Sequence, residues 1–204
     1  MVASDPLAPL LTPLGLRALG HAQDGDSTIM LIGPDEPVFW SVFTASTEYN
    51  DGAPDPMDRW SQRVISEVAA KLDAEALFPF GGPPYAPFYT WAVNTGHFWP
   101  SPIGFLVHED AGLFASFRGA IRWSKPAESG TAPQPCLTCD APCKSACPVG
   151  AFNDGYDVNA CKAHVASDDG ADCRNNGCLA RRACPVGTDR RMPEQSAFHM
   201  EAFL

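Results

Sequence analysis

The chain has 204 residues, of which 24 are acidic and 14 are Lys or Arg, so its formal net charge is -10. An acidic chain lacks the basic face with which proteins neutralise phosphates, which argues against nucleic-acid binding and favours a redox partner with a basic face. No apolar stretch approaches the roughly 18 residues of a membrane span, and Arg17 is the first cation, so we expect a cytoplasmic protein without a leader and without membrane contact.

Strands and a helix are predicted in the first third of the chain. Segments 16–22 and 28–32 alternate or run apolar and end at Gly or Pro, which is typical of strands. A helix is expected to begin at Asp55 and Pro56, because apolar residues then recur at helical spacing as far as Leu72. We therefore expect an α/β domain over residues 1–123, a platform for a cofactor or a partner.

Residues 76–104 combine eight aromatic side chains with Gly and Pro. Such a stretch could wall a flat cofactor, although core packing is the commoner outcome. Strands over 103–108 and 113–123 are predicted around a turn at 109–112. Linker composition then marks a domain boundary at 124–135, and Pro193 begins a predicted C-terminal helix, 193–204, that packs on the body.

All eight cysteines lie in the segment 136–192, after 135 residues that contain none. Disulfides would need an oxidising compartment and a domain that is short of core. Two tetrahedral zinc sites would also use eight thiolates, but such sites usually gather two separated Cys-x2-Cys pairs. Here four cysteines come in one run, and Cys147 and Cys184 each precede proline, which favours two [4Fe-4S] clusters.

The cysteine segment resembles the double-cluster ferredoxin module of epoxyqueuosine reductases and corrinoid-containing reductive dehalogenases. In that module four cysteines ending in Cys-Pro are followed by one isolated cysteine at the start of a helix, here Cys161, and by three more ending in Cys-Pro. Every gap between the clustered cysteines except the first is wider here, by one or two residues. The resemblance implies two ligand sets: Cys136, Cys139, Cys143 and Cys184 for the first cluster, and Cys147, Cys161, Cys173 and Cys178 for the second.

The similarity extends upstream to residues 101–121, which resemble the strand-turn-strand that precedes the clusters in those reductases and a stretch of cobalamin-processing chaperones. It implies an α+β protein in which a nitroreductase-like domain, able to hold a corrinoid, precedes a small, loop-rich ferredoxin-like domain. Two departures stand against reductase chemistry. The segment 78–85 has no acid where the epoxyqueuosine enzymes place a catalytic Asp, and the chain stops at Leu204 without the repeats that grip tRNA.

The combined observations predict an electron-transfer protein that carries single electrons through two [4Fe-4S] clusters, with no catalytic residue that can be named. The alternative is a corrinoid-dependent reductase or cobalamin-reducing protein, in which the clusters feed a cofactor bound near residues 78–105. A zinc-stapled interaction module is a third reading of the same cysteines. Arg181 and Arg182 lie between two predicted ligands and are candidates for tuning a cluster or docking a partner.

Overall fold

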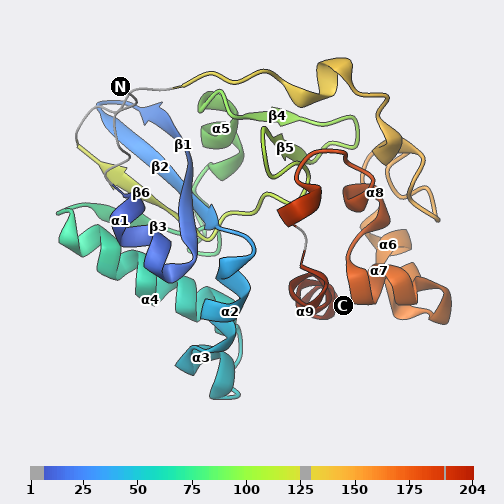
Figure 1. Ribbon diagram of the computed structural model, residues 1–204, viewed down its shortest axis with the longest axis horizontal. Coiled ribbons are helices and arrows are strands. Elements are labelled where there is room, and N and C mark those ends of the chain that lie inside the picture. The colour runs from blue at the N-terminus through green and yellow to red at the C-terminus, as the bar shows by residue number, and fades with distance from the viewer. Residues whose placement is uncertain (1–6, 125–129, 191) are drawn as a thin grey trace. The chain divides into compact units, whose positions relative to one another are not determined.

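The computed structural model describes residues 7–124, 130–190 and 192–204 (Figure 1). The protein is mixed α+β, as predicted. It divides into two compact units, the first made of Met1–His97 with Ser116–Ala132 and the second of Phe98–Ala115 with Pro133–Leu204. Of the linker expected at 124–135, residues 125–129 lie outside the described residues.

A four-stranded antiparallel sheet forms the centre of the first unit, with strand order β1-β2-β6-β3. Strands β1 (Leu16–Asp24) and β2 (Ser27–Pro34) confirm the two predicted strands. Strands β3 (Glu75–Leu77) and β6 (Gly119–Trp123) complete the sheet. Every residue of β2 after Ser27 is buried, so both faces of this strand are covered.

Helices surround this sheet. The predicted long helix is present as α4, whose first residue is Pro56, and Asp55 before it has a positive φ and makes no side-chain capping bond. Figure 1 shows α4 beside β3 and β6, and α5 beside β1. Among the described residues, no helix combines the length and the apolar character of a membrane span. The helices of this unit are α1 (Ala8–Leu11), η1 (Thr12–Leu14), α2 (Val38–Thr44), α3 (Thr47–Asn50), α4 (Pro56–Lys71) and α5 (Phe88–Asn94).

Aromatic side chains fill the contact between α2 and α4. The ring centroid of Trp60 lies 5.5 Å from that of Phe39 and 5.8 Å from that of Phe43, both in edge-on geometry. All three side chains are almost completely buried. Large apolar rings at this contact bury much area at once, which fixes the short helix α2 on the long one.

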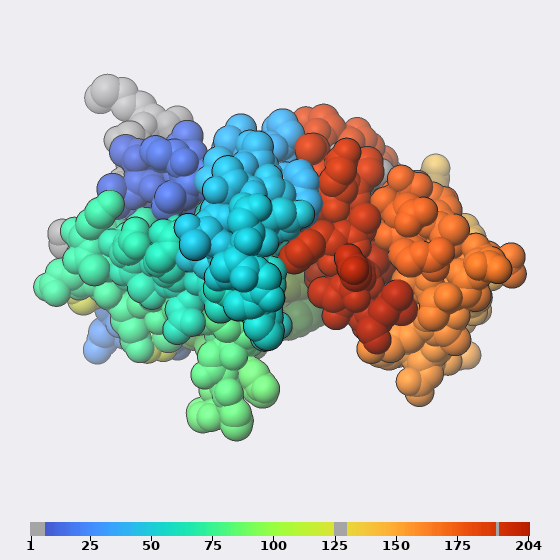
Figure 2. Space-filling view, turned by 90° about the horizontal axis from the view of Figure 1, so that it is seen from below, coloured from blue at the N-terminus to red at the C-terminus, as the bar shows by residue number. Residues whose placement is uncertain are grey.

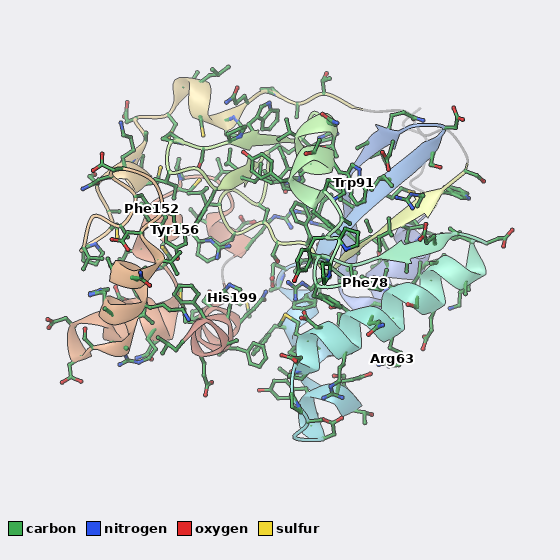
Figure 3. All side chains as sticks on the ribbon, turned by 180° about the vertical axis from the view of Figure 1, so that it is seen from behind. Arg63, Phe78, Trp91, Phe152, Tyr156 and His199 are labelled. Carbon is green, nitrogen blue, oxygen red and sulfur yellow. The ribbon has the colours of Figure 1, made fainter. Side chains whose placement is uncertain are left out.

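The aromatic stretch 76–104 is shared between the two units. Phe88 and Trp91, a ring pair 5.4 Å apart, are buried in the first unit, and Figure 3 marks Trp91 there with Phe78. Tyr85 and Tyr89 are exposed. The buried members of this stretch therefore pack as ordinary core.

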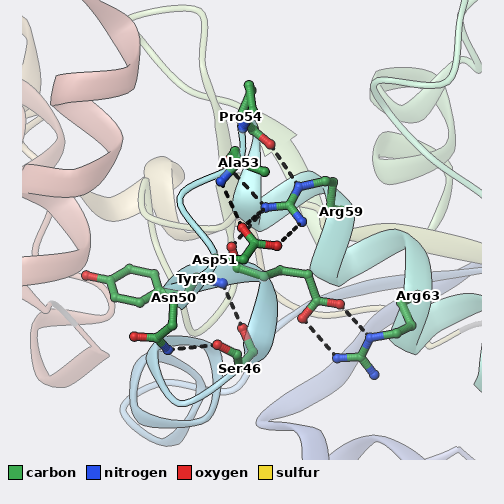
Figure 4. A network of polar contacts seen from close by, with 9 residues as sticks. Ser46, Tyr49, Asn50, Asp51, Ala53, Pro54, Arg59 and Arg63 are labelled. Carbon is green, nitrogen blue, oxygen red and sulfur yellow. Dashed lines mark hydrogen bonds and ion pairs between the residues drawn. The ribbon is translucent and has the colours of Figure 1, made fainter.

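Two arginines of α4 hold the loop that joins it to α3 (Figure 4). Arg59 donates two hydrogen bonds of 2.7 Å to the Asp51 carboxylate and further bonds to three backbone carbonyls. Arg63 donates to the Glu48 carboxylate, and this contact lowers the pKa of Glu48. Planar guanidinium groups suit such paired contacts, so they order a loop that has little apolar surface of its own.

The second unit contains the hairpin of β4 (Phe98–Pro100) and β5 (Leu106–His108). The predicted pairing of 103–108 with 113–123 is wrong, because β5 pairs with β4 whereas β6 pairs with β2 and β3. Apolar side chains explain the difference, since Val107 and Leu113 share a buried cluster with Cys143 and Cys184. Residues 98–115 therefore belong to the unit of the cysteines and not to the expected domain 1–123.

Short helices make up the rest of the second unit: η2 (Pro135–Thr138), η3 (Pro142–Lys144), α6 (Val158–Ala166), η4 (Asp168–Gly170), α7 (Ala171–Asn176), α8 (Leu179–Arg182), η5 (Thr188–Arg190) and α9 (Pro193–Phe203). The predicted C-terminal helix is thus present as α9. It packs against α7, and Met200 is buried there with Val165 and Cys173. Figure 2 shows the dark red atoms of α9 beside the orange atoms of residues 158–176.

Phe39→Ala should lower the free energy of unfolding of the first unit by about 3–5 kcal/mol, because the lost ring leaves a cavity against Trp60. Its neighbour Val38 is 49% exposed on the same helix, so Val38→Ala is the matched control and should change stability by less than about 0.5 kcal/mol. Urea denaturation followed by tryptophan fluorescence measures both. Equal midpoints for the two variants would contradict the packing described.

Candidate functional site

The first cysteine pocket gathers four thiols from two distant parts of the chain. Cys136 and Cys139 come from η2 and its end, Cys143 from η3, and Cys184 from the loop after α8. The pocket encloses about 280 Å³ of empty space, counted with its open side. Its other walls come from the β4–β5 hairpin, the following turn and the cysteine loops: Ser101, Pro102, Val107, Leu113, Ala141, Pro142 and Pro185.

The second cysteine pocket gathers the other four thiols. Cys147 follows η3, Cys161 lies on α6, Cys173 lies on α7 and Cys178 immediately precedes α8. The pocket encloses about 320 Å³, again counted with its open side. Its other walls are mostly apolar: Pro148, Val149, Phe152, His164, Val165, Leu179, Ala180 and Met200.

These two pockets contain the same two sets of four cysteines that the resemblance implied. All eight cysteines are free thiols, so disulfides play no part in the structure. Within the described part of the chain, no three His, Cys, Asp or Glu side chains converge closely enough to hold a metal ion. The fit to a metal centre therefore depends on the grouping of the thiols and not on a preformed coordination sphere, and cluster binding stays a prediction.

A repeated Cys-Pro-Val-Gly turn places Cys147 and Cys184. Gly150 and Gly187 end the two copies with φ values of 62° and 69°, a backbone conformation that glycine adopts without strain. The carbonyl of each glycine then accepts a hydrogen bond from the N–H three residues later. The two copies begin with cysteines that line different pockets, Cys147 the second and Cys184 the first.

Local hydrogen bonds orient two cysteines of the second pocket. The Asp157 side chain accepts a bond of 2.9 Å from the N–H of Ala160 and so caps α6, which carries Cys161 one turn from its start. The N–H of Ala151 donates to the Cys147 sulfur at 3.3 Å. Such N–H to sulfur contacts stabilise a thiolate and tune whatever the thiolate binds.

Three aromatic rings pack beside the second pocket. Phe152, which lines the pocket, stacks on Tyr156 with ring centroids 5.0 Å apart, and Phe105 meets both rings edge-on. Figure 3 shows Phe152 and Tyr156 next to one another. Burial raises the pKa of the Tyr156 hydroxyl, and a hydrogen bond with Cys161 raises it further.

Burial also raises the pKa of four thiols. For Cys136 and Cys143 the neighbouring thiols of the first pocket add to this effect. For Cys173 and Cys178 backbone N–H groups and nearby arginines oppose it. These four thiols therefore hold their protons more strongly than exposed thiols do, and a metal that binds them as thiolates must displace those protons.

The arginines near the cysteines hold loops together. Arg181 donates a 2.7 Å hydrogen bond to the carbonyl of Leu113 and lies over the ring of Phe114, 4.7 Å from its centroid. Burial lowers the pKa of Arg181, and the nearby Cys178 thiol partly offsets this effect. Arg182 donates to the Asp172 carboxylate at 2.6 Å. Both cations thus have a structural function as well as a position next to predicted ligands.

The turn after β5 contacts the first pocket directly. His108 is buried, and its Nδ1 lies 2.6 Å from a carboxylate oxygen of Asp110. Gly112 closes this turn with a φ of 57°, and a Cβ at this position would lie 3.2 Å from the Cys184 sulfur and 2.3 Å from the carbonyl oxygen of Val186. Only glycine allows the turn to approach the loop of Cys184 and Val186 this closely.

Sequence reasoning missed the hydroxyl of Ser101. This side chain is 8% exposed and lines the first pocket. Its oxygen is buried and has no hydrogen-bond partner in the described structure. Leaving a buried hydroxyl unpaired costs about 1–3 kcal/mol, so an orphaned donor beside four thiols supports the fit of a sulfur-containing group in this pocket. No sequence motif identifies Ser101. It is recognised only because residues 98–115 fold in the same unit as the cysteine segment.

Comparison of the chain with models of protein families, with curated proteins and with solved structures gave no match. The donor sets of the two pockets, four thiols each, are those that iron-sulfur clusters and structural zinc ions both accept.

Gly112→Ala should lower the stability of the second unit more than Gly104→Ala does. Both positions have positive φ, which costs an alanine about 1 kcal/mol. A Cβ at Gly104 meets nothing within 4 Å, whereas a Cβ at Gly112 overlaps the Val186 carbonyl and should cost about 1–3 kcal/mol more. Urea denaturation followed by circular dichroism provides the comparison. If the two variants unfold at the same urea concentration, the turn does not pack against the Cys184 loop as described.

Proposed function

We propose that this chain is an electron-transfer protein that holds two [4Fe-4S] clusters, one in each cysteine pocket. The observation that carries the proposal is the division of eight thiols into two sets of four. The last cysteine of each run lines the pocket of the other run, and we call this arrangement the crossing. When bound, such clusters supply one-electron oxidation and reduction with little rearrangement.

The crossing favours iron-sulfur clusters over zinc. Cys143 and Cys147 are four residues apart and line different pockets, and so do Cys178 and Cys184, which are six residues apart. In two-cluster ferredoxins the cysteine before proline likewise ligates the other cluster. Zinc sites are usually built from pairs of nearby cysteines that share one ion.

Electron transfer between two centres requires that they lie close together. Helix α8 contributes to the surroundings of both pockets. Ala180, on α8, lines the second pocket and belongs to the buried cluster that packs around the first. Phe152 also lines the second pocket and packs against that cluster. The two predicted clusters therefore share one protein wall.

The finer assignments follow the resemblance. We propose a ferredoxin-like second unit and a nitroreductase-like first unit, in a protein that acts in the cytoplasm. The net charge of -10 supports a redox partner with a basic face and no binding to nucleic acid.

Metal analysis tests the proposal first. Protein prepared without oxygen should contain about eight iron and eight sulfide per chain and should lose visible absorption near roughly 400 nm when dithionite is added. About two zinc ions and no sulfide would overturn the redox proposal and leave a structural module.

Single alanine replacements test the grouping of the ligands. Cys147→Ala and Cys178→Ala should alter the same EPR signal of the reduced protein, and Cys143→Ala and Cys184→Ala should alter the other, because each pair lines one pocket. The four variants should share a far-ultraviolet circular dichroism spectrum with the parent. If Cys147→Ala and Cys143→Ala alter the same signal, the ligands follow sequence order and the crossed assignment fails.

A further inference from the structure

Ser101 lines the first pocket, and its hydroxyl is buried without a partner in the described part of the chain. The walls around it consist of four thiols and apolar side chains such as Val107 and Leu113. An O–H donor in such surroundings needs an acceptor that occupies the pocket itself.

Backbone hydrogen bonds fix the position of this serine. Its N–H donates to the carbonyl of Phe105 at 2.8 Å, and its own carbonyl accepts from the N–H of Gly104 at 2.9 Å. Ser101 directly follows β4, whose last residue, Pro100, pairs with Leu106. The side chain is therefore anchored at both backbone groups and needs no rearrangement to donate its proton.

We propose that the Ser101 hydroxyl donates a hydrogen bond to a sulfur of the cluster in the first pocket and raises its reduction potential. This inference depends on the proposed function. Hydrogen bonds to cluster sulfurs are among the factors that set the potential, because reduction adds negative charge that a donor stabilises. Ser101 is thus a tuning residue and not a ligand.

The effect should be confined to one cluster. Among the described residues that line the second pocket none carries a hydroxyl, and the hydroxyl beside it, that of Tyr156, already has a hydrogen bond with Cys161. The two clusters therefore have different hydrogen-bond environments, and the protein itself provides an internal reference for the measurement.

Redox titration of the full-length, cluster-loaded protein by EPR tests the inference. In Ser101→Ala the ratio of reduced to oxidised first cluster at a fixed potential should fall about tenfold, which corresponds to about 59 mV for a one-electron couple. The second cluster should titrate as in the parent protein. Cys139→Ser identifies which signal belongs to the first pocket.

Ser101→Thr and Ser101→Val form a pair of equal shape in which only Thr keeps the hydroxyl. The potential of the first cluster should be near the parental value in Ser101→Thr and lowered in Ser101→Val. Ser145 lies between two predicted ligands in sequence, and its exposed hydroxyl already donates a hydrogen bond to the carbonyl of Pro142. Ser145→Ala should therefore leave both potentials unchanged.

The outcomes separate this inference from the proposed function. Full iron content with unchanged potentials in Ser101→Ala would overturn the tuning role and leave the electron-transfer proposal intact. Equal potentials in Ser101→Thr and Ser101→Val would also overturn the tuning role. Loss of the first cluster from Ser101→Ala would overturn it too, because it would show that Ser101 is needed for packing of the pocket. A parent protein without iron and sulfide would overturn both.

Discussion

The second unit depends on one constraint: two short runs of chain must each supply thiols to two pockets. Cys143 and Cys147 are too close in sequence to be separated without a sharp change of direction, and the same holds at the end of the second run. A Cys-Pro-Val-Gly turn, with its glycine at positive φ, then redirects the chain after Cys147 and again after Cys184. The rest of this unit consists of loops and short helices around the two cysteine pockets, and its described residues form only a two-stranded sheet.

The same cysteines that we assign as ligands also make the hydrophobic core. Cys143 and Cys184 belong to one buried cluster and Cys173 to another, packed with residues such as Val107 and Met200. A protonated thiol behaves as a small apolar side chain. Under the proposed function, ligation would convert these core residues into anions, which would couple metal binding to the folding of this unit.

Local sequence signals predicted the parts of the fold that local interactions determine. The apolar spacing predicted α4, Pro193 predicted α9, and alternation predicted β1 and β2. The strands at 106–108 and 119–123 read as one hairpin because each has the right residues for a strand, but sequence alone does not say which neighbour a strand pairs with. That pairing decides where Ser101 lies, and it depends on buried contacts far apart in the chain.

The allocation of residues 98–115 has a consequence for the chain as a whole. The polypeptide passes between the units at 97–98, again at 115–116 and again at 132–133. The cysteine segment therefore does not form its unit alone, because a fragment beginning at Pro133 would lack Ser101, Val107 and Leu113, three walls of the first pocket. Because the two units alternate along the sequence, neither can be cut out of the chain as one continuous segment.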